Sequence, residues 1–167
     1  RFDEAMETLD LIQGELSPRA AVRLTMERGR VLNSSGMASE ALPLFKQAYS
    51  QAIEAREEGL AVDAAHMAAI AESGDEILRW NELALAIAET SEQPDARRWR
   101  KSLYNNLGWT YFDRGELEKA RQNFEQSHQA ALEMRDDRAA RIARWCIAKT
   151  LRVMGSPEEA LKLQKEL

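Results

Sequence analysis

Apolar and small residues recur three and four positions apart along almost the whole chain, as expected for amphipathic α-helices. The pattern is clearest in residues 103–124, LYNNLGWTYFDRGELEKARQNF. Two stripes occur around Gly115. The stripe before it consists of Tyr104, Leu107, Gly108 and Tyr111. The stripe after it consists of Leu117, Ala120, Phe124 and Ser127. Because glycine tolerates the left-handed conformation that often ends a helix, the pattern predicts two antiparallel helices joined at Gly115.

Gly108 stands in the middle of the first of these helices, where glycine costs about 1 kcal/mol relative to alanine. Such a cost needs a structural reason. The absence of a side chain lets a second helix approach closely, so we expect Gly108 to lie at a helix–helix contact.

The spacing of the small residues is repeated elsewhere in the chain. Forty residues after Gly108, Gly115 and Ala120, the sequence has Ala148, Gly155 and Ala160. Near the start, the same spacings of seven, five and four separate Gly29, Gly36, Ala41 and Phe45. Gly36 precedes Gly115 by 79 residues, which leaves room for one more unit at 60–88, with Gly74 at its turn. Repetition at this period is typical of a solenoid.

The pattern resembles the tetratricopeptide repeat over nearly the whole chain. The residues that carry the resemblance are Leu107, Gly108, Tyr111, Ala120 and Phe124 in one unit, and Gly29, Leu32, Ala41, Phe45 and Ala48 in another. The units are longer than the usual 34 or so residues. The unit at 60–88 departs most, since His66, Met67 and Ala68 replace the expected Leu-Gly. The resemblance implies an all-α, right-handed superhelical solenoid of stacked antiparallel helical hairpins.

We expect a single helical repeat domain over residues 1–167. It would begin with a lone helix at 1–14, followed by hairpins at 17–57, 59–90, 94–134 and 137–167. In the third hairpin, Asp95–Arg114 is expected to form one continuous first helix. Because the sequence begins with Arg1 rather than Met, we expect it to be a fragment of a longer protein.

Composition narrows the classes of partner. The net charge of −5 and pI of about 5.2 argue against general nucleic-acid binding, which requires a broad basic face. No apolar run approaches the roughly 20 residues that cross a bilayer, so no membrane partner is expected. No signal peptide is visible, which favours a cytoplasmic location. Cys146 is the one cysteine and cannot form an internal disulfide.

The resemblance also indicates a candidate binding groove, because the first helices of such hairpins line a concave surface. Asn105 and Asn106 are mediocre helix formers in mid-helix, and their amides can hold the backbone of an extended peptide. Cationic side chains nearby could bind acidic groups, and Trp109 could form an apolar wall. The predicted groove consists of Arg30, Asn33, His66, Asn105, Asn106, Trp109, Lys149 and Arg152. The alternative is that the Asn pair is merely exposed or hydrogen-bonds a neighbouring helix.

No catalytic constellation is apparent, so we expect no enzyme. His66 lacks an evident nucleophile and orienting carboxylate, and the chain's two histidines are too few and too dispersed for a metal site. No cofactor is expected. The basic runs at 97–101 and 135–144 are interpreted as solvated faces.

The predicted function is therefore a non-enzymatic protein–protein interaction module. Its concave groove would bind a peptide or a helix of a partner, one that carries acidic groups. The alternative is a sensor or self-association segment of a larger bacterial signalling or transcriptional regulator. The exposed terminal helices are candidate surfaces for homo-oligomerisation.

Overall fold

The computed structural model describes residues 1–165, and these form α-helices joined by short turns, with no strand among them. The end of the last predicted hairpin, at 166–167, lies outside the described residues. The chain divides into two compact units, Arg1–Arg97 and Arg98–Leu167. Each unit is described by itself, and the expectation of one single domain remains a prediction. No helix in the described part of the chain is both long and apolar enough to cross a bilayer.

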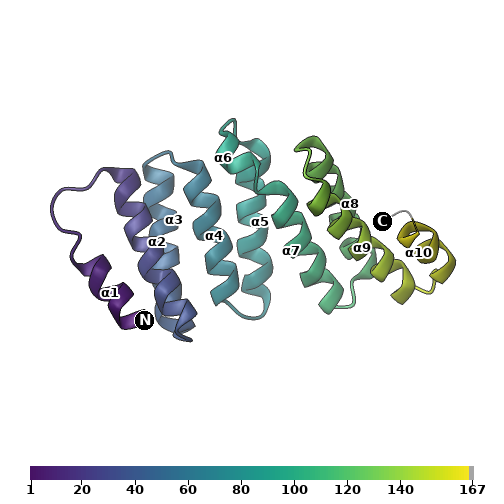
Figure 1. The fold of residues 1–167 in the computed structure, drawn as a ribbon, viewed down its shortest axis with the longest axis horizontal. Helices are drawn as coiled ribbons and strands as arrows, with labels where there is room; N and C mark the ends of the chain where they lie inside the picture. The colour runs from purple at the N-terminus through teal and green to yellow at the C-terminus, as the bar shows by residue number, and fades with distance from the viewer. Residues whose placement is uncertain (166–167) are drawn as a thin grey trace. The chain divides into compact units, whose positions relative to one another are not determined.

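The first unit is a series of antiparallel helices in which neighbours in sequence pack side by side (Figure 1). Its helices are α1 (Phe2–Asp10), α2 (Pro18–Ser34), α3 (Ala38–Glu54), α4 (Glu58–Ala71), α5 (Asp75–Thr90) and the short α6 (Pro94–Arg97). The Ser17 side chain accepts a hydrogen bond from the Ala20 backbone N–H, and Pro18 opens α2. This start of α2 has the N-cap and first-turn proline that the sequence pattern favours.

The second unit contains two further hairpins in the same arrangement (Figure 1). Its helices are α7 (Arg100–Asp113), α8 (Leu117–Glu133), α9 (Asp137–Val153) and α10 (Pro157–Gln164). α8 packs against both α7 and α9, and α10 packs against α9. α7 and α9 are thus the first helices of successive hairpins, and they contact each other beside α8.

The expected continuous helix over Asp95–Arg114 is wrong. The chain forms α6, passes through a turn at 98–99, and begins again as α7. α6 packs on α4 and α5, with Ala96 fully buried. A Cβ added at Gly59 would lie 2.8 Å from the Cβ of Asp95, so α6 approaches α4 where there is no side chain. This docking holds α6 on the first unit.

Close packing inside the hairpins confirms the expectation for Gly108. A Cβ placed there would lie 2.5 Å from Cε1 of Phe124, which is closer than real side chains approach. In the first unit, a Cβ at Gly29 would lie 2.6 Å from Cε1 of Phe45. Both phenylalanines are fully buried. Each aromatic ring therefore occupies the space that the missing glycine side chain leaves open on the facing helix.

The turn after α7 has the predicted glycine stop. Gly115 has φ of +75°. The Glu116 N–H donates to the Tyr111 carbonyl at 2.9 Å, and the Gly115 N–H donates to the Phe112 carbonyl at 3.0 Å. This pair of bonds is the Schellman motif, which satisfies carbonyl groups that the end of a helix leaves open.

Candidate functional site

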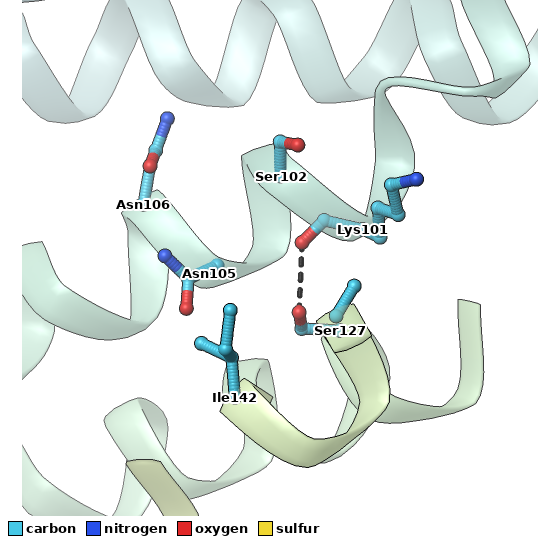
Figure 2. Close-up of a pocket in the computed structure, with 7 residues that line it drawn as sticks. Lys101, Ser102, Asn105, Asn106, Ser127 and Ile142 are labelled. Carbon is cyan, nitrogen blue, oxygen red and sulfur yellow. Dashed lines mark hydrogen bonds between the residues drawn. The ribbon is translucent and has the colours of Figure 1, made fainter. Parts of the chain in front are cut away.

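The second unit presents a pocket between α7, α8 and α9 (Figure 2). Its volume is about 230 Å³, and it is lined by Lys101, Ser102, Asn105, Asn106, Ser127, Ala139 and Ile142. We call it the amide pocket. Buried Ser127 donates a hydrogen bond from Oγ to the Lys101 carbonyl at 2.7 Å, which ties α8 to the start of α7. Lys101 Nζ pairs with Asp136 at 2.6 Å and, with the Ala139 N–H, holds the pKa of that carboxyl below its usual value.

The two asparagines occupy different places in the amide pocket. In Figure 2, the Asn105 side chain points toward Ile142, whereas that of Asn106 points away from it. Asn105 Oδ1 accepts a weak hydrogen bond from Cys146 Sγ at 3.8 Å. Ile142 is 48% exposed and forms an apolar edge. The pocket therefore offers amide donors and acceptors beside one aliphatic side chain.

An aromatic and cationic cluster lies further along the same two helices. It consists of Trp109 and Phe112 on α7 with Trp145 and Lys149 on α9, and we call it the Trp–Lys cluster. The Lys149 ammonium lies 4.6 Å from the ring centroid of Trp109, 5.3 Å from that of Phe112 and 5.5 Å from that of Trp145. Such contacts are worth about 0.5–2 kcal/mol, more where water is excluded.

Trp109 links this cluster to the core of the hairpin. Its ring packs edge-on against Phe124 at 5.3 Å between centroids, and its centroid is 6.3 Å from that of Trp145. Trp145 is 45% exposed, so its outer face remains accessible to a partner. Arg152 is exposed one turn beyond Lys149 on α9. Trp109 thus packs against the core of the hairpin, whereas Trp145 and Arg152 remain exposed to solvent.

The predicted groove residues of the first unit have a different setting. The guanidinium of Arg30 binds both oxygens of Asp63 at 2.7 Å and also pairs with Glu27. These carboxylates raise the pKa of Arg30 against the opposing effect of burial. Arg30 thus already binds carboxylates within the chain. Burial lowers the pKa of the half-buried His66, with Asp63 opposing this shift and Arg30 adding to it.

The remaining residue of that set, Asn33, is half-buried one turn beyond Arg30 on α2. Arg30, Asn33 and His66 therefore belong to the first unit. The other five predicted residues are Asn105, Asn106, Trp109, Lys149 and Arg152, which lie on α7 and α9 of the second unit. Within residues 1–165, no three His, Cys, Asp or Glu side chains gather as a metal site would require.

Comparison with known proteins identifies the repeat. Residues 102–134 match the tetratricopeptide repeat family. One similar structure comes from Podosopora anserina and is titled as a putative kinesin light chain with nearly identical TPR-like repeats. It is 18% identical in sequence to this chain and superimposes with a TM-score of 0.71. The match covers 99% of this chain and 84% of the Podosopora anserina chain. This chain has a tetratricopeptide-like repeat fold.

Two MamA structures agree with that assignment. MamA of AMB-1 has 16% identity and a TM-score of 0.63, with 99% of this chain and 87% of that chain covered. MamA of MSR-1 has 17% identity and a TM-score of 0.60, with 99% and 84% covered. No curated protein matches the chain in sequence. Tetratricopeptide-like repeats are generally non-enzymatic scaffolds for protein interaction, and solenoids of this kind use extended surfaces for it.

Cys146 is a buried core residue of the second unit, packed with Ala120 and Phe124. Burial raises the pKa of its thiol to about 11, although Lys149 opposes the shift. At pH 8 the folded protein therefore holds only about 0.1% of the thiolate form that reacts with alkylating agents. We expect iodoacetamide to modify Cys146 at least ~100-fold more slowly in the native protein than in guanidinium, as mass spectrometry would measure.

The raised pKa of Cys146 also makes the stability of the folded protein depend on pH. Because the folded-state pKa lies above the unfolded value of about 8.5, the neutral buried thiol contributes stability fully below pH 8.5, and this contribution is lost as pH rises toward 11. The Cys146→Ala variant lacks the thiol. As the pH rises from about 8.5 toward 11, its guanidinium denaturation midpoint should therefore fall less than that of the native protein. Equal alkylation rates in native and denatured protein would contradict this account of Cys146.

Lys101 and Ser127, which line the amide pocket, were not among the predicted groove residues. Lys101 was interpreted as part of a solvated basic run, yet it pairs with Asp136 and lines the amide pocket. Ser127 lies on the core-facing stripe of α8. Because buried hydroxyl groups form hydrogen bonds, its position in the sequence already indicated a hydrogen bond to the facing helix. Trp145 lies four residues before Lys149, a spacing that places both on one face of α9.

Proposed function

We propose that this protein is an interaction module in which the α7–α9 face binds an extended peptide segment of a partner protein. The observation that supports this most directly is the juxtaposition of the amide pocket and the Trp–Lys cluster along the same two helices. An extended peptide has unpaired backbone N–H and C=O groups at regular intervals. Side-chain amides carry both donors and acceptors and can bind these groups without selecting particular side chains.

The Trp–Lys cluster supplies the second part of the binding energy. Half-exposed Trp145 offers a flat apolar surface of the kind that forms hot spots in interfaces. The Lys149 ammonium lies 5.5 Å from the centroid of the Trp145 ring, and exposed Arg152 follows one turn further along α9. We therefore expect the bound segment to place an apolar side chain on Trp145 and an acidic side chain near Lys149 or Arg152. The first-unit residues Arg30, Asn33 and His66 are not required for this binding mode.

The direct test uses peptides selected from a displayed random library against the native protein. In the variant Asn105→Ala/Asn106→Ala/Lys149→Ala, the dissociation constant of a selected peptide should rise at least about tenfold. Each lost hydrogen bond is worth about 0.5–1.5 kcal/mol, and about 1.4 kcal/mol corresponds to tenfold in affinity. Fluorescence anisotropy with a labelled peptide measures the change.

A matched control replaces two amides and one lysine elsewhere on the same unit. Gln122→Ala/Gln126→Ala/Lys162→Ala alters exposed side chains of α8 and α10, and it should bind the peptide with unchanged affinity. Both triple variants should retain the helical circular dichroism of the native protein. The proposal fails if folded groove and control variants bind every selected peptide equally well.

A further inference from the structure

A second pocket lies on the second unit between α8 and α9, and it shares no residue with the amide pocket. Its volume is about 370 Å³, within the range of small-molecule sites. The residues that line it are His128, Leu132, Asp137, Ala140, Arg141 and Arg144. On α9 these residues follow a stripe of three- and four-residue spacing that is distinct from the stripe of Ile142, Trp145 and Lys149. We call this site the outer pocket.

We propose that the outer pocket binds an organic anion, with the guanidinium groups of Arg141 and Arg144 holding its phosphoryl or carboxylate group. Arginine presents a planar fork of donors that matches two oxygens of such a group. Arg141 and Arg144 are three residues apart on α9, so both forks reach the same side of the helix. Ala140, a small apolar residue that is 5% exposed, also lines the pocket.

The distribution of charge supports an anionic ligand. Residues 98–167 contain fourteen Lys and Arg against ten Asp and Glu, whereas residues 1–97 contain nine against eighteen. The excess of positive charge is concentrated on α9, where five basic side chains accompany the single acid Asp137. The basic side chains are Arg138, Arg141, Arg144, Lys149 and Arg152. Although the net charge of the whole chain is −5, α9 carries a net positive charge, and the outer pocket lies along this helix.

His128 contributes a third polar group from α8. Burial lowers its pKa, and the positive charge of Arg144 lowers it further. The lowered pKa favours the neutral imidazole, which can donate one N–H to an anion. An anion bound between Arg141 and Arg144 would offset their charge and favour the protonated imidazole, so His128 reports directly on occupancy.

Two other lining residues determine what kind of anion fits. Leu132 is 49% exposed at the pocket and offers an apolar contact, so an anion with a hydrocarbon portion should bind more tightly than inorganic phosphate. Asp137 also faces the pocket and repels an anion, so Asp137→Asn should tighten binding. A cation site would show the opposite response to this substitution.

The test follows the two histidines by NMR while phenyl phosphate, benzoate or inorganic phosphate is added to the protein. Because an opposite charge near an imidazole favours its charged form, we expect saturable binding of phenyl phosphate or benzoate to raise the pKa of His128 by about one unit. The comparison of these two probes distinguishes a phosphoryl from a carboxylate ligand. His66 lies in the other unit and serves as the internal control.

Matched variants separate the pocket from general attraction to a basic helix. Arg141→Gln/Arg144→Gln should abolish the pKa response of His128 to the anion. Arg135→Gln/Arg138→Gln removes the same amount of charge outside the pocket and should preserve most of that response. Should the first pair fail to fold, Arg141→Gln alone, at an exposed side chain, should weaken binding severalfold. The proposal is overturned if His128 responds to none of the three anions, or if both pairs reduce the response equally.

Discussion

Replacing Phe124 by alanine is expected to lower the free energy of unfolding by about 3–5 kcal/mol. The ring of Phe124 is fully buried, packs edge-on against Trp109 and fills the space over Gly108. Because the glycine has no side chain to move into the void, removal of the ring leaves a cavity that α7 and α8 can close only by moving together. Guanidinium denaturation followed by circular dichroism measures the loss.

The control for this substitution is Gln122→Ala, on the same helix but exposed. It should change the free energy of unfolding by no more than about 0.5 kcal/mol. A loss below about 1 kcal/mol for Phe124→Ala would show that the ring is not the main contact between α7 and α8.

Substitution of Gly108 by leucine is expected to destabilise the protein by at least about 2 kcal/mol, although leucine is the better helix former. The gain in helix propensity is under about 1 kcal/mol. The leucine Cβ would lie 2.5 Å from the Phe124 ring, so either the ring leaves its rotamer or the hairpin opens, and overpacking of this kind is destabilising. Thermal and guanidinium unfolding both report the change.

A double-mutant cycle isolates this steric contact. Phe124→Leu shortens the opposing side chain, so Gly108→Ala should cost less free energy in that background than in the native protein. The equivalent pair in the first unit, Gly29 and Phe45, provides an independent repeat of the experiment. A Gly108→Leu protein more stable than the native one would refute the packing account.

The spacing of small and apolar residues along the chain predicted much of the fold. The stripe around Gly108 and Phe124 predicted a close helical hairpin, and Gly115 predicted where its first helix stops. Both predictions concern residues near each other in sequence, where helix geometry dictates which side chains share a face. The break at 98–99 was not predicted, because it depends on α6 packing against Gly59, almost forty residues earlier in the chain.

The candidate sites were predicted less completely for the same reason. Asn105 and Asn106 were identified as unusual polar residues in mid-helix, and they do line a pocket. That Arg30 is held by Asp63 could not be inferred, since the pair joins α2 to α4. The basic run at 135–144 was interpreted as a solvated face, whereas Arg141 and Arg144 of that run line a pocket with His128 of α8.

The sequence by itself determined the helical character of the chain, the repeat period and the glycine positions that let a hairpin close. Each of these follows from backbone propensity and from the 3.6-residue period, which act over a few neighbouring residues. The tertiary structure alone decided which charges pair and which polar side chains share a pocket. These choices depend on the distance and rotation between packed helices, and the side chains that set them come from positions far apart in the chain.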